Sequence, residues 1–368
     1  MSGLADHDRR RILVTGADTF WGGRVAQAFE ADEKIDVIVG LGATDPAVAL
    51  DRTDFVKVSD HAYSTLNRIV SAIGVDTIVH TGLMVDSTLG SSNRLQDTNV
   101  IGTLNLLAAA GAPGSTVRTL VVKSSGLVYG ATSRDPYAFT ESMTRSAPAR
   151  TSVERSLLEA EALVRDFAQD SPGVSVTVLR FANVLGADLN TPLSRNLSRS
   201  VCPSLFGYDP LLQFIEQGDV VRALVHATLH ADAGTFNVGG AGRLPLSEVA
   251  SICGTRIVAL PPWQVEMYAG MLRRLGVFDL PPELVPLLRY GRGMDTKRFA
   301  DTGFEYRYSS VEAVHAFARA IRLRKGVGRP GEHFTYQEDV EHFLRHARSV
   351  ARPPTERAEP EPAGPEVP

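Results

Sequence analysis

The sequence lacks the features that mark secreted, membrane-spanning or nucleic-acid-binding proteins. Its 368 residues include two cysteines, Cys202 and Cys253, which excludes a disulfide framework and fits a reducing compartment. No apolar run approaches the ~20 residues that a membrane-spanning helix needs, and the first residues, MSGLADHDRRR, lack the apolar core of a signal peptide. The net charge is −4 and the basic residues are scattered, so nothing indicates a nucleic-acid or anionic membrane partner. We expect a soluble cytoplasmic protein.

Apolar strand-like runs alternate with helical patterns in the first half of the chain. Strands are expected at 12–14, 37–39, 77–80, 119–123 and 174–180, and helices at 22–30, 63–72, 95–110 and 153–169. Such alternation predicts an α/β fold with a Rossmann-type doubly wound parallel sheet over residues 10–186.

The alternation stops after Gly186. Residues 187–219 look irregular, and a helix at 220–231 and a strand at 234–238 are expected to return to the Rossmann domain as segment 220–240. Residues 187–219 and 241–330 are expected to form a smaller C-terminal substrate-binding lobe, with a strand at 256–260 and an amphipathic helix at 263–275. We also predict a flexible N-terminus over 1–9, a helix over 331–350 and a Pro/Glu-rich disordered tail over 351–368.

The most informative stretch is residues 11–30, RILVTGADTFWGGRVAQAFE. An apolar strand ends at Gly16, a turn follows, and a helical pattern begins at Gly22. This arrangement directs backbone N–H groups and a positive helix end toward a pyrophosphate, so it predicts a bound dinucleotide. Thr19 stands where the middle glycine of a G-x-x-G-x-x-G spacing should fall. A turn that has lost its ligand is the alternative interpretation.

Six segments stand in a familiar order: VTGADTFWGG, DTNVIGTLNLLAA, KSSGLVYG, TVLRFANVLG, GTFNVGG and MDTKRFADTGFEYRYSSVEA. With them the chain resembles, over about 11–320, an extended short-chain dehydrogenase/reductase of the NAD-dependent epimerase/dehydratase family. Actinobacterial proteins similar to UDP-glucose 4-epimerase are the most alike. The resemblance implies NAD or NADP, a small-molecule substrate such as a sugar nucleotide, and a homodimer formed through the helices at 95–110 and 153–169.

The resemblance also assigns roles to residues. Ser125, four residues before Tyr129, is in the place of the catalytic Ser/Thr, and Asn183 matches an asparagine that contacts the substrate phosphate. Asp219 matches an acidic helix N-cap. A satisfied strand-end hydroxyl and ordinary structural polar groups are the alternatives. Cofactor contacts are implied for Gly16, Thr19, Phe20, Trp21, Gly22, Gly42, Asp60, Thr81, Gly82 and Asn99.

Several positions depart from the family pattern. The catalytic Tyr-x-x-x-Lys pair falls on Thr151 and Arg155, which have neither a titratable phenol nor an exchangeable lysine proton. The acid that holds the adenosine ribose falls on Gly42, with Asp45 as a displaced substitute. An arginine that holds the substrate diphosphate falls on Leu212.

These departures leave two hypotheses open. The chain is either an NAD(P)-dependent epimerase, dehydratase or reductase with an atypical site, or a non-catalytic dinucleotide-binding sensor or scaffold. A metal site is not expected, although His226 and His230, and His342 and His346 after Glu338, have helical ligand spacing. The apolar stripe at Trp263, Tyr268, Met271, Leu272 and Leu275 indicates core or dimer contact rather than lipid contact.

Overall fold

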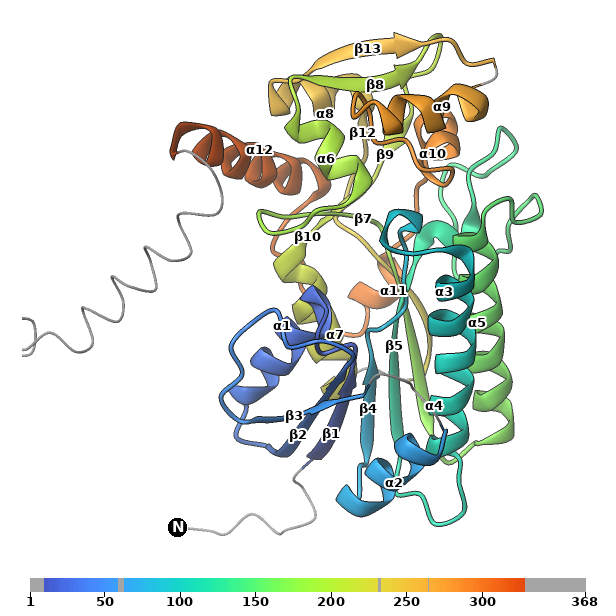
Figure 1. The fold of residues 1–368 in the computed structure, drawn as a ribbon, viewed down its shortest axis with the longest axis vertical. Coiled ribbons are helices and arrows are strands. Elements are labelled where there is room, and N and C mark those ends of the chain that lie inside the picture. Colours follow the sequence, from blue (N-terminus) through green and yellow to red (C-terminus); the bar gives the residue numbers. More distant parts are fainter. Residues whose placement is uncertain (1–9, 59–62, 231–232, 264, 328–368) are drawn as a thin grey trace, which may run out of the picture. The chain divides into compact units, whose positions relative to one another are not determined.

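A computed structural model describes residues 10–58, 63–230, 233–263 and 265–327 (Figure 1). The chain divides into two units, 1–319 and 320–368, and the sheet and the three cavities discussed below belong to the first. Several expectations lie outside the described residues: Asp60, Glu338, His342 and His346, the segment 1–9, the helix at 331–350 and the tail at 351–368.

The centre of the first unit is one parallel sheet of seven strands. Its order is β11-β6-β5-β4-β1-β2-β3, which confirms the Rossmann-type α/β fold. Because all the strands run parallel, their carboxyl ends meet at one edge, where such folds bind ligands. The strands are β1 (Arg10–Thr15), β2 (Ile35–Gly42), β3 (Thr53–Lys57), β4 (Thr77–His80), β5 (Thr119–Ser125), β6 (Ser175–Phe181) and β11 (Gly234–Val238).

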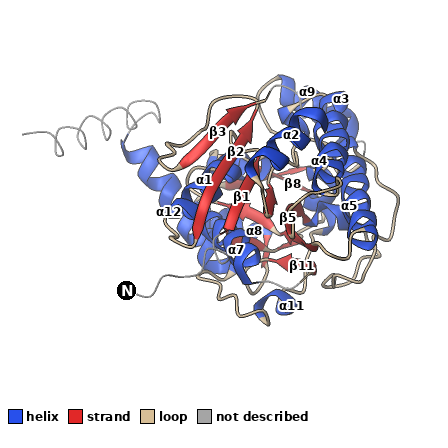
Figure 2. Ribbon diagram, turned by 90° about the horizontal axis from the view of Figure 1, so that it is seen from below, coloured by secondary structure: helices blue, strands red, loops and turns tan. Residues whose placement is uncertain are grey.

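Two apolar clusters hold helices against the two faces of the sheet (Figure 2). On one face lie α1 (Phe20–Glu30) and α7 (Gln217–His230), and on the other lie α2 (Tyr63–Ile73), α4 (Gly102–Ala110) and α5 (Ser152–Asp170). Strand residues alternate between these clusters, as a pleated strand covered on both sides requires: Val121 packs toward α1 and α7, and Val122 packs toward α4 and α5.

The expected elements are present with small changes of boundary. The helix expected at 95–110 is divided into α3 (Ser92–Gln96), a π-helical turn at Asp97–Ile101, and α4. β3 was not expected. The expectation of an irregular 187–219 was wrong, because this segment contains α6 (Pro192–Ser198), β8 (Val201–Leu205), β9 (Leu211–Leu212) and β10 (Phe214–Glu216).

Three two-stranded sheets accompany the main sheet. β7 (Asn183–Leu185) pairs with β10, β9 pairs with β12 (Leu244–Pro245), and β8 pairs with β13 (Arg256–Leu260). The remaining helices are α8 (Leu246–Cys253), α9 (Val265–Arg274), α10 (Leu284–Tyr290), α11 (Lys297–Ala300) and α12 (Ser310–Val327). Across the described residues, none of the helices has the length and apolar character needed to cross a membrane.

Candidate active site

The glycine turn between β1 and α1 is packed too closely for side chains. Gly16 has a φ of +73°, and a Cβ at Gly22 would lie 2.1 Å from the Gly16 carbonyl oxygen. Gly82 and the Thr81 hydroxyl, which donates to the Thr15 carbonyl at 2.8 Å, close the turn from β4. Glycine is therefore required at both positions, because the turn leaves no room there for a side chain.

Thr19 is the N-cap of α1. Its hydroxyl donates to the Gly16 carbonyl at 2.7 Å and accepts from the Gly22 N–H at 3.3 Å. The N–H groups of Phe20 and Trp21, the first two residues of the helix, have no carbonyl one turn earlier within the helix. They mark the positive end of α1, where an anion is stabilised.

A cavity of about 320 Å³ lies beside this turn. It is lined by the turn and β4 on one side and by the start of α4 on the other: Gly16, Asp18, Thr19, Ala43, His80, Gly82, Thr98 and Gly102 are among its residues. Sequence reasoning missed Asp18. Its carboxylate Oδ2 accepts from the N–H groups of Ala43 and Thr44 at 2.9 and 3.0 Å.

The carboxylate of Asp18 fills the space next to Gly42. A Cβ at Gly42 would lie 2.5 Å from Asp18 Cγ, so the Asp18 side chain takes up the space that a side chain at position 42 would need. Asp45, the substitute considered from sequence, instead pairs with Lys57 at 3.2 Å and is 85% exposed. Two features of the sequence could have indicated Asp18: it is an acid within the glycine turn, and the second strand ends in a glycine, Gly42, where an acid was expected.

Asn99 fixes the loop after β4. It is fully buried in the π-helical turn, where its Oδ1 accepts from Met84 N–H at 2.7 Å and its Nδ2 donates to the Met84 carbonyl at 2.9 Å. The same amide donates to Ser156 Oγ on α5 at 2.9 Å. Since Met84 lines the 320 Å³ cavity, Asn99 holds a wall of that cavity.

A second cavity, of about 130 Å³, brings Ser125 and Asn183 together with Trp21. Ser125 ends β5, and its hydroxyl accepts from the Leu127 N–H at 3.2 Å. Asn183 begins β7 and donates to the Gln213 carbonyl at 2.9 Å. Thr19 lines the first cavity and Trp21 the second, so the N-terminus of α1 reaches both.

Thr151 and Arg155 are not among the residues that line either cavity. Thr151 is the N-cap of α5, in a reciprocal capping box with Glu154, and Arg155 is exposed and donates to the Arg150 carbonyl. The helix residue that meets Asn99 is Ser156, one position later. A shift by one residue would place the pair on Ser152 and Ser156, which also lack a phenol and an amine.

In the part of the chain that the structure describes, no tyrosine lines the 130 Å³ cavity. Tyr129 is buried and stacked on Phe139, and its hydroxyl donates to Asn237 Oδ1 and accepts from Arg180 Nη1, both at 2.8 Å. Burial raises the pKa of the Tyr129 phenol, and the charge of Arg180 offsets part of that rise. Tyr129 is therefore part of the structural core.

Two further ionisable residues of the 130 Å³ cavity were missed from sequence. Leu212, at the position of the expected arginine, is fully buried in β9, but Arg292 reaches the cavity and donates to the Gly130 carbonyl at 2.7 Å. Burial lowers the pKa of Arg292 to about 10, which leaves it charged at neutral pH. Glu283 also lines the cavity, and burial raises the pKa of its carboxyl, which accepts from the Ser87 N–H at 2.8 Å.

The remaining expectations concern residues away from both cavities. Asp219 is the third residue of α7 rather than its N-cap, and its carboxylate accepts from Arg222 and from the N–H groups of Arg307 and Tyr308. The His226 and His230 rings lie 5.4 Å apart, and the described part of the chain contains no group of three or more His, Cys, Asp or Glu arranged to hold a metal. In the apolar stripe, Tyr268 and Leu272 are half-buried, whereas Trp263, Met271 and Leu275 are exposed.

Comparison with known proteins gives a consistent result. Residues 12–239 match the model of the NAD dependent epimerase/dehydratase family. An uncharacterized protein of Mycobacterium tuberculosis is 32% identical over 318 residues, which is 85% of this chain and 84% of the relative. UDP-glucuronic acid decarboxylase 6 of Arabidopsis thaliana is 26% identical over 259 residues, which is 65% of this chain and 72% of the relative.

Solved structures share the fold at lower identity. The UDP-glucose 4-epimerase of Thermotoga maritima, determined with UDP-glucose, has a TM-score of 0.66 at 20% identity and covers 85% of this chain and 99% of its own. The dTDP-glucose 4,6-dehydratase of Bacillus anthracis, in complex with NAD, has a TM-score of 0.65 at 18% identity and covers 86% of this chain and 98% of its own.

Proposed function

The chain belongs to the NAD-dependent epimerase/dehydratase family, and from this membership we propose that it binds NAD and acts on a sugar nucleotide. The observation that carries the proposal is the pair of cavities at the N-terminus of α1. One is bounded by a glycine turn and an acid, and the other by Ser125, Asn183 and Arg292.

The glycine turn fits a dinucleotide. A phosphate could approach the turn through the 320 Å³ cavity beside it, and the N–H groups of Phe20 and Trp21, which lack carbonyl partners within the helix, would donate to its oxygens. Asp18 would accept hydrogen bonds from the adenosine ribose. Its charge disfavours a 2′-phosphate, so we propose NAD rather than NADP.

The 130 Å³ cavity fits the sugar end of a nucleotide sugar. Arg292 supplies a buried cation for a diphosphate, and Ser125 supplies a hydroxyl for the sugar oxygen that changes oxidation state. Arg292 also borders a cavity of about 780 Å³ in which Arg289 and Tyr208 offer a cation and an aromatic ring to a nucleotide. The Thermotoga maritima epimerase, whose structure contains UDP-glucose, has the same fold.

When bound, NAD would serve as the hydride acceptor. The residues of this chain would position the sugar and transfer its hydroxyl proton. A non-catalytic sensor is the second candidate, because neither Thr151 and Arg155 nor Ser152 and Ser156 provide the usual proton donor. Both candidates share the cofactor turn and differ only in turnover.

A homodimer formed through α4 and α5 belongs to the same proposal. Ile101 and Leu104 are each 46% exposed on the outer side of this helix layer, where an apolar contact between subunits would cover them. Size-exclusion chromatography with light scattering is expected to give a dimer for the wild type and a monomer for Leu104→Glu.

The decisive experiment separates binding from turnover. Purified protein is titrated with NAD and NADP by nicotinamide-dependent protein fluorescence, and then incubated with UDP-glucose, UDP-galactose, UDP-glucuronic acid and dTDP-glucose while products are followed by chromatography. We expect tight NAD binding and conversion of at least one sugar. Binding without conversion would favour the sensor, and the absence of binding to either dinucleotide would contradict both candidates.

A further inference from the structure

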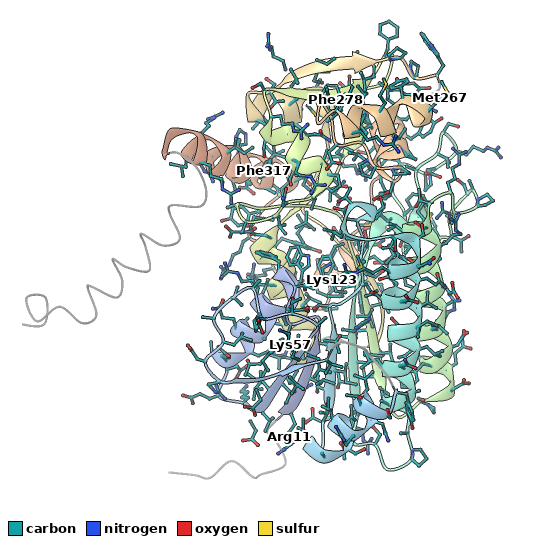
Figure 3. All side chains as sticks on the ribbon, viewed as in Figure 1. Arg11, Lys57, Lys123, Met267, Phe278 and Phe317 are labelled. Carbon is teal, nitrogen blue, oxygen red and sulfur yellow. The ribbon has the colours of Figure 1, made fainter. Side chains whose placement is uncertain are left out.

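Lys123 is the most unusual polar residue of the sheet. It lies inside the apolar strand β5, two residues before Ser125, and its side chain is 3% exposed. Ser124 points to the other face, where its hydroxyl bonds to Glu161 on α5 at 2.5 Å. Alternation along the strand therefore directs Lys123, which is labelled in Figure 3, and Ser125 to the same side of the sheet. Both residues line the 130 Å³ cavity.

The Lys123 ammonium is surrounded by aromatic rings rather than by acceptors. Its Nζ lies 5.1 Å from the centre of the Trp21 ring on α1 and 6.0 Å from that of the Phe181 ring on β6. Within the described residues we find neither a hydrogen bond nor an ion pair to it. Buried lysines are normally paired, because an unpaired ammonium in apolar surroundings is unstable.

Nearby ionisable groups are engaged elsewhere. In the cavity, the Glu283 carboxylate accepts from Ser87 and the Arg292 guanidinium donates to the Gly130 carbonyl. On α7, which packs against β5, Asp219 is bonded to Arg222. Among the described residues Lys123 thus has two aromatic contacts but no hydrogen-bonding or oppositely charged partner, and it lines a cavity that a ligand would fill.

We propose that Lys123 transfers the proton at the substrate oxygen beside Ser125, in place of the absent Tyr/Lys pair. This inference rests on the proposed function. Neutral Lys123 would take the hydroxyl proton of the sugar and be left as an ammonium as the alcohol becomes a ketone. NAD, when bound, would supply the acceptor for the hydride that the carbon loses. The same proton returns when the ketone is reduced.

The acidity of the lysine suits this role. Burial lowers the pKa of the Lys123 ammonium to about 8, so roughly one molecule in ten carries the neutral amine at pH 7 and about half do at pH 8. A general base works best when its pKa lies close to the working pH. The ring faces of Trp21 and Phe181 favour the ammonium, so burial is what lowers the pKa of Lys123.

The first test measures the amine itself. The chain contains five lysines, at 34, 57, 123, 297 and 325, so protein labelled with [¹³Cε]lysine gives few signals, and Lys123→Met identifies the one that matters. With NAD bound, we expect this signal to titrate more than one pH unit below the surface lysines. Titration together with the surface lysines would overturn the proposal.

The second test measures proton transfer. Stopped-flow absorbance follows reduction of bound nicotinamide by whichever panel sugar the wild type converts. Lys123→Met is expected to slow this step about 100-fold or more, to remove its alkaline-activated limb near pH 8, and to leave NAD affinity within threefold. Lys297→Met, which removes an exposed lysine paired with Asp301, is the matched control and should behave as wild type.

A positive test guards against a variant that is merely misfolded. Lys123→Ala should regain part of the lost rate when ethylamine is added, and the gain should depend on the concentration of the neutral amine. Either a Lys123→Met rate equal to wild type or a slowed Lys123→Ala variant that ethylamine does not rescue would overturn the role of Lys123 while leaving the proposed function in place. An inactive wild type would instead remove the proposed function and the lysine with it.

Discussion

The carboxylate of Asp18 occupies the space that a side chain at Gly42 would need. The two residues come from the glycine turn and from the end of β2, and a Cβ on Gly42 would lie 2.5 Å from Asp18 Cγ. An acid at the end of the second strand is the usual partner of the adenosine ribose. Here the acid next to the end of that strand comes from the turn, and the strand ends in glycine.

Replacing Asp18 should change which dinucleotide binds. Asp18→Asn removes the charge and retains one acceptor for the Ala43 N–H, so the loop should stay in place. We expect NAD affinity to fall about tenfold, equivalent to about 1.4 kcal/mol, and the preference for NAD over NADP to shrink by more than that. Isothermal titration calorimetry with both dinucleotides measures this change.

Asp45→Asn is the matched control for Asp18→Asn. Asp45 follows the same strand but pairs with Lys57 at the surface. Its replacement should leave both affinities unchanged, and a larger effect at Asp45 than at Asp18 would assign the ribose to Asp45.

Thr19 is expected to act on stability rather than on cofactor affinity. Thr19→Ala removes the N-cap of α1 and should lower the free energy of unfolding by about 1 kcal/mol, whereas Thr19→Gly should cost only a few tenths. Urea unfolding gives these differences. NAD affinity of Thr19→Gly should equal that of wild type, and a marked loss would show that the threonine contacts the cofactor.

The sequence was sufficient for elements whose apolar pattern is local. β1, β4 and β5 are short apolar runs, and α5 shows a helical period, so each was expected within a few residues of its observed bounds. β8 was missed because Pro203 interrupts its pattern and because its partner, β13, lies some fifty residues later. α6 was missed although Thr191 and Pro192 mark a helix start.

The site was less accessible to sequence reasoning than the fold. Ser125 and Asn183 were found because motifs mark them, and the structure places both at one cavity. Asp18 and Lys123 lie within the segments VTGADTFWGG and KSSGLVYG, but the family resemblance assigned them no role, and Arg292 lies outside the six segments. Their relevance comes from contacts between distant segments: Asp18 with the loop after β2, Lys123 with α1 and β6, and Arg292 with the loop after β5.

Replacing Asn99 should lower the free energy of unfolding more than replacing most other polar residues. Asn99→Leu preserves approximate volume but leaves the Met84 N–H and carbonyl without their buried partner. We expect the free energy of unfolding to fall by about 3 kcal/mol. Asn93→Leu, at an exposed position of α3, should change it by less than about 0.5 kcal/mol, and equal effects of the two variants in urea unfolding would contradict the role of Asn99.

Arg292 should contribute to sugar-nucleotide binding and not to NAD binding. Arg292→Leu removes the buried cation of the 130 Å³ cavity, so affinity for UDP-glucose or UDP should fall by a factor of about 10 to 100, as expected for a charge-assisted contact. NAD affinity should not change. Arg68→Leu, on the exposed side of α2, is the control. Loss of NAD binding along with UDP binding would show a general disturbance of the fold.

Lys123 should make the free energy of unfolding rise with pH between about 8 and 10.5. Its pKa is about 8 in the folded chain and 10.5 as the ordinary value, so between these limits the unfolded chain holds more protons and stability rises with pH. Below pH 8 the folded protein bears the full cost of the buried charge, at most about 3 kcal/mol. Lys123→Met should therefore be more stable than wild type at pH 7, and the difference should shrink as the pH approaches 10.5. Urea unfolding of both proteins across this range measures the difference and cancels the titration of the other groups. A difference that stays constant with pH would show that Lys123 titrates normally in the folded chain.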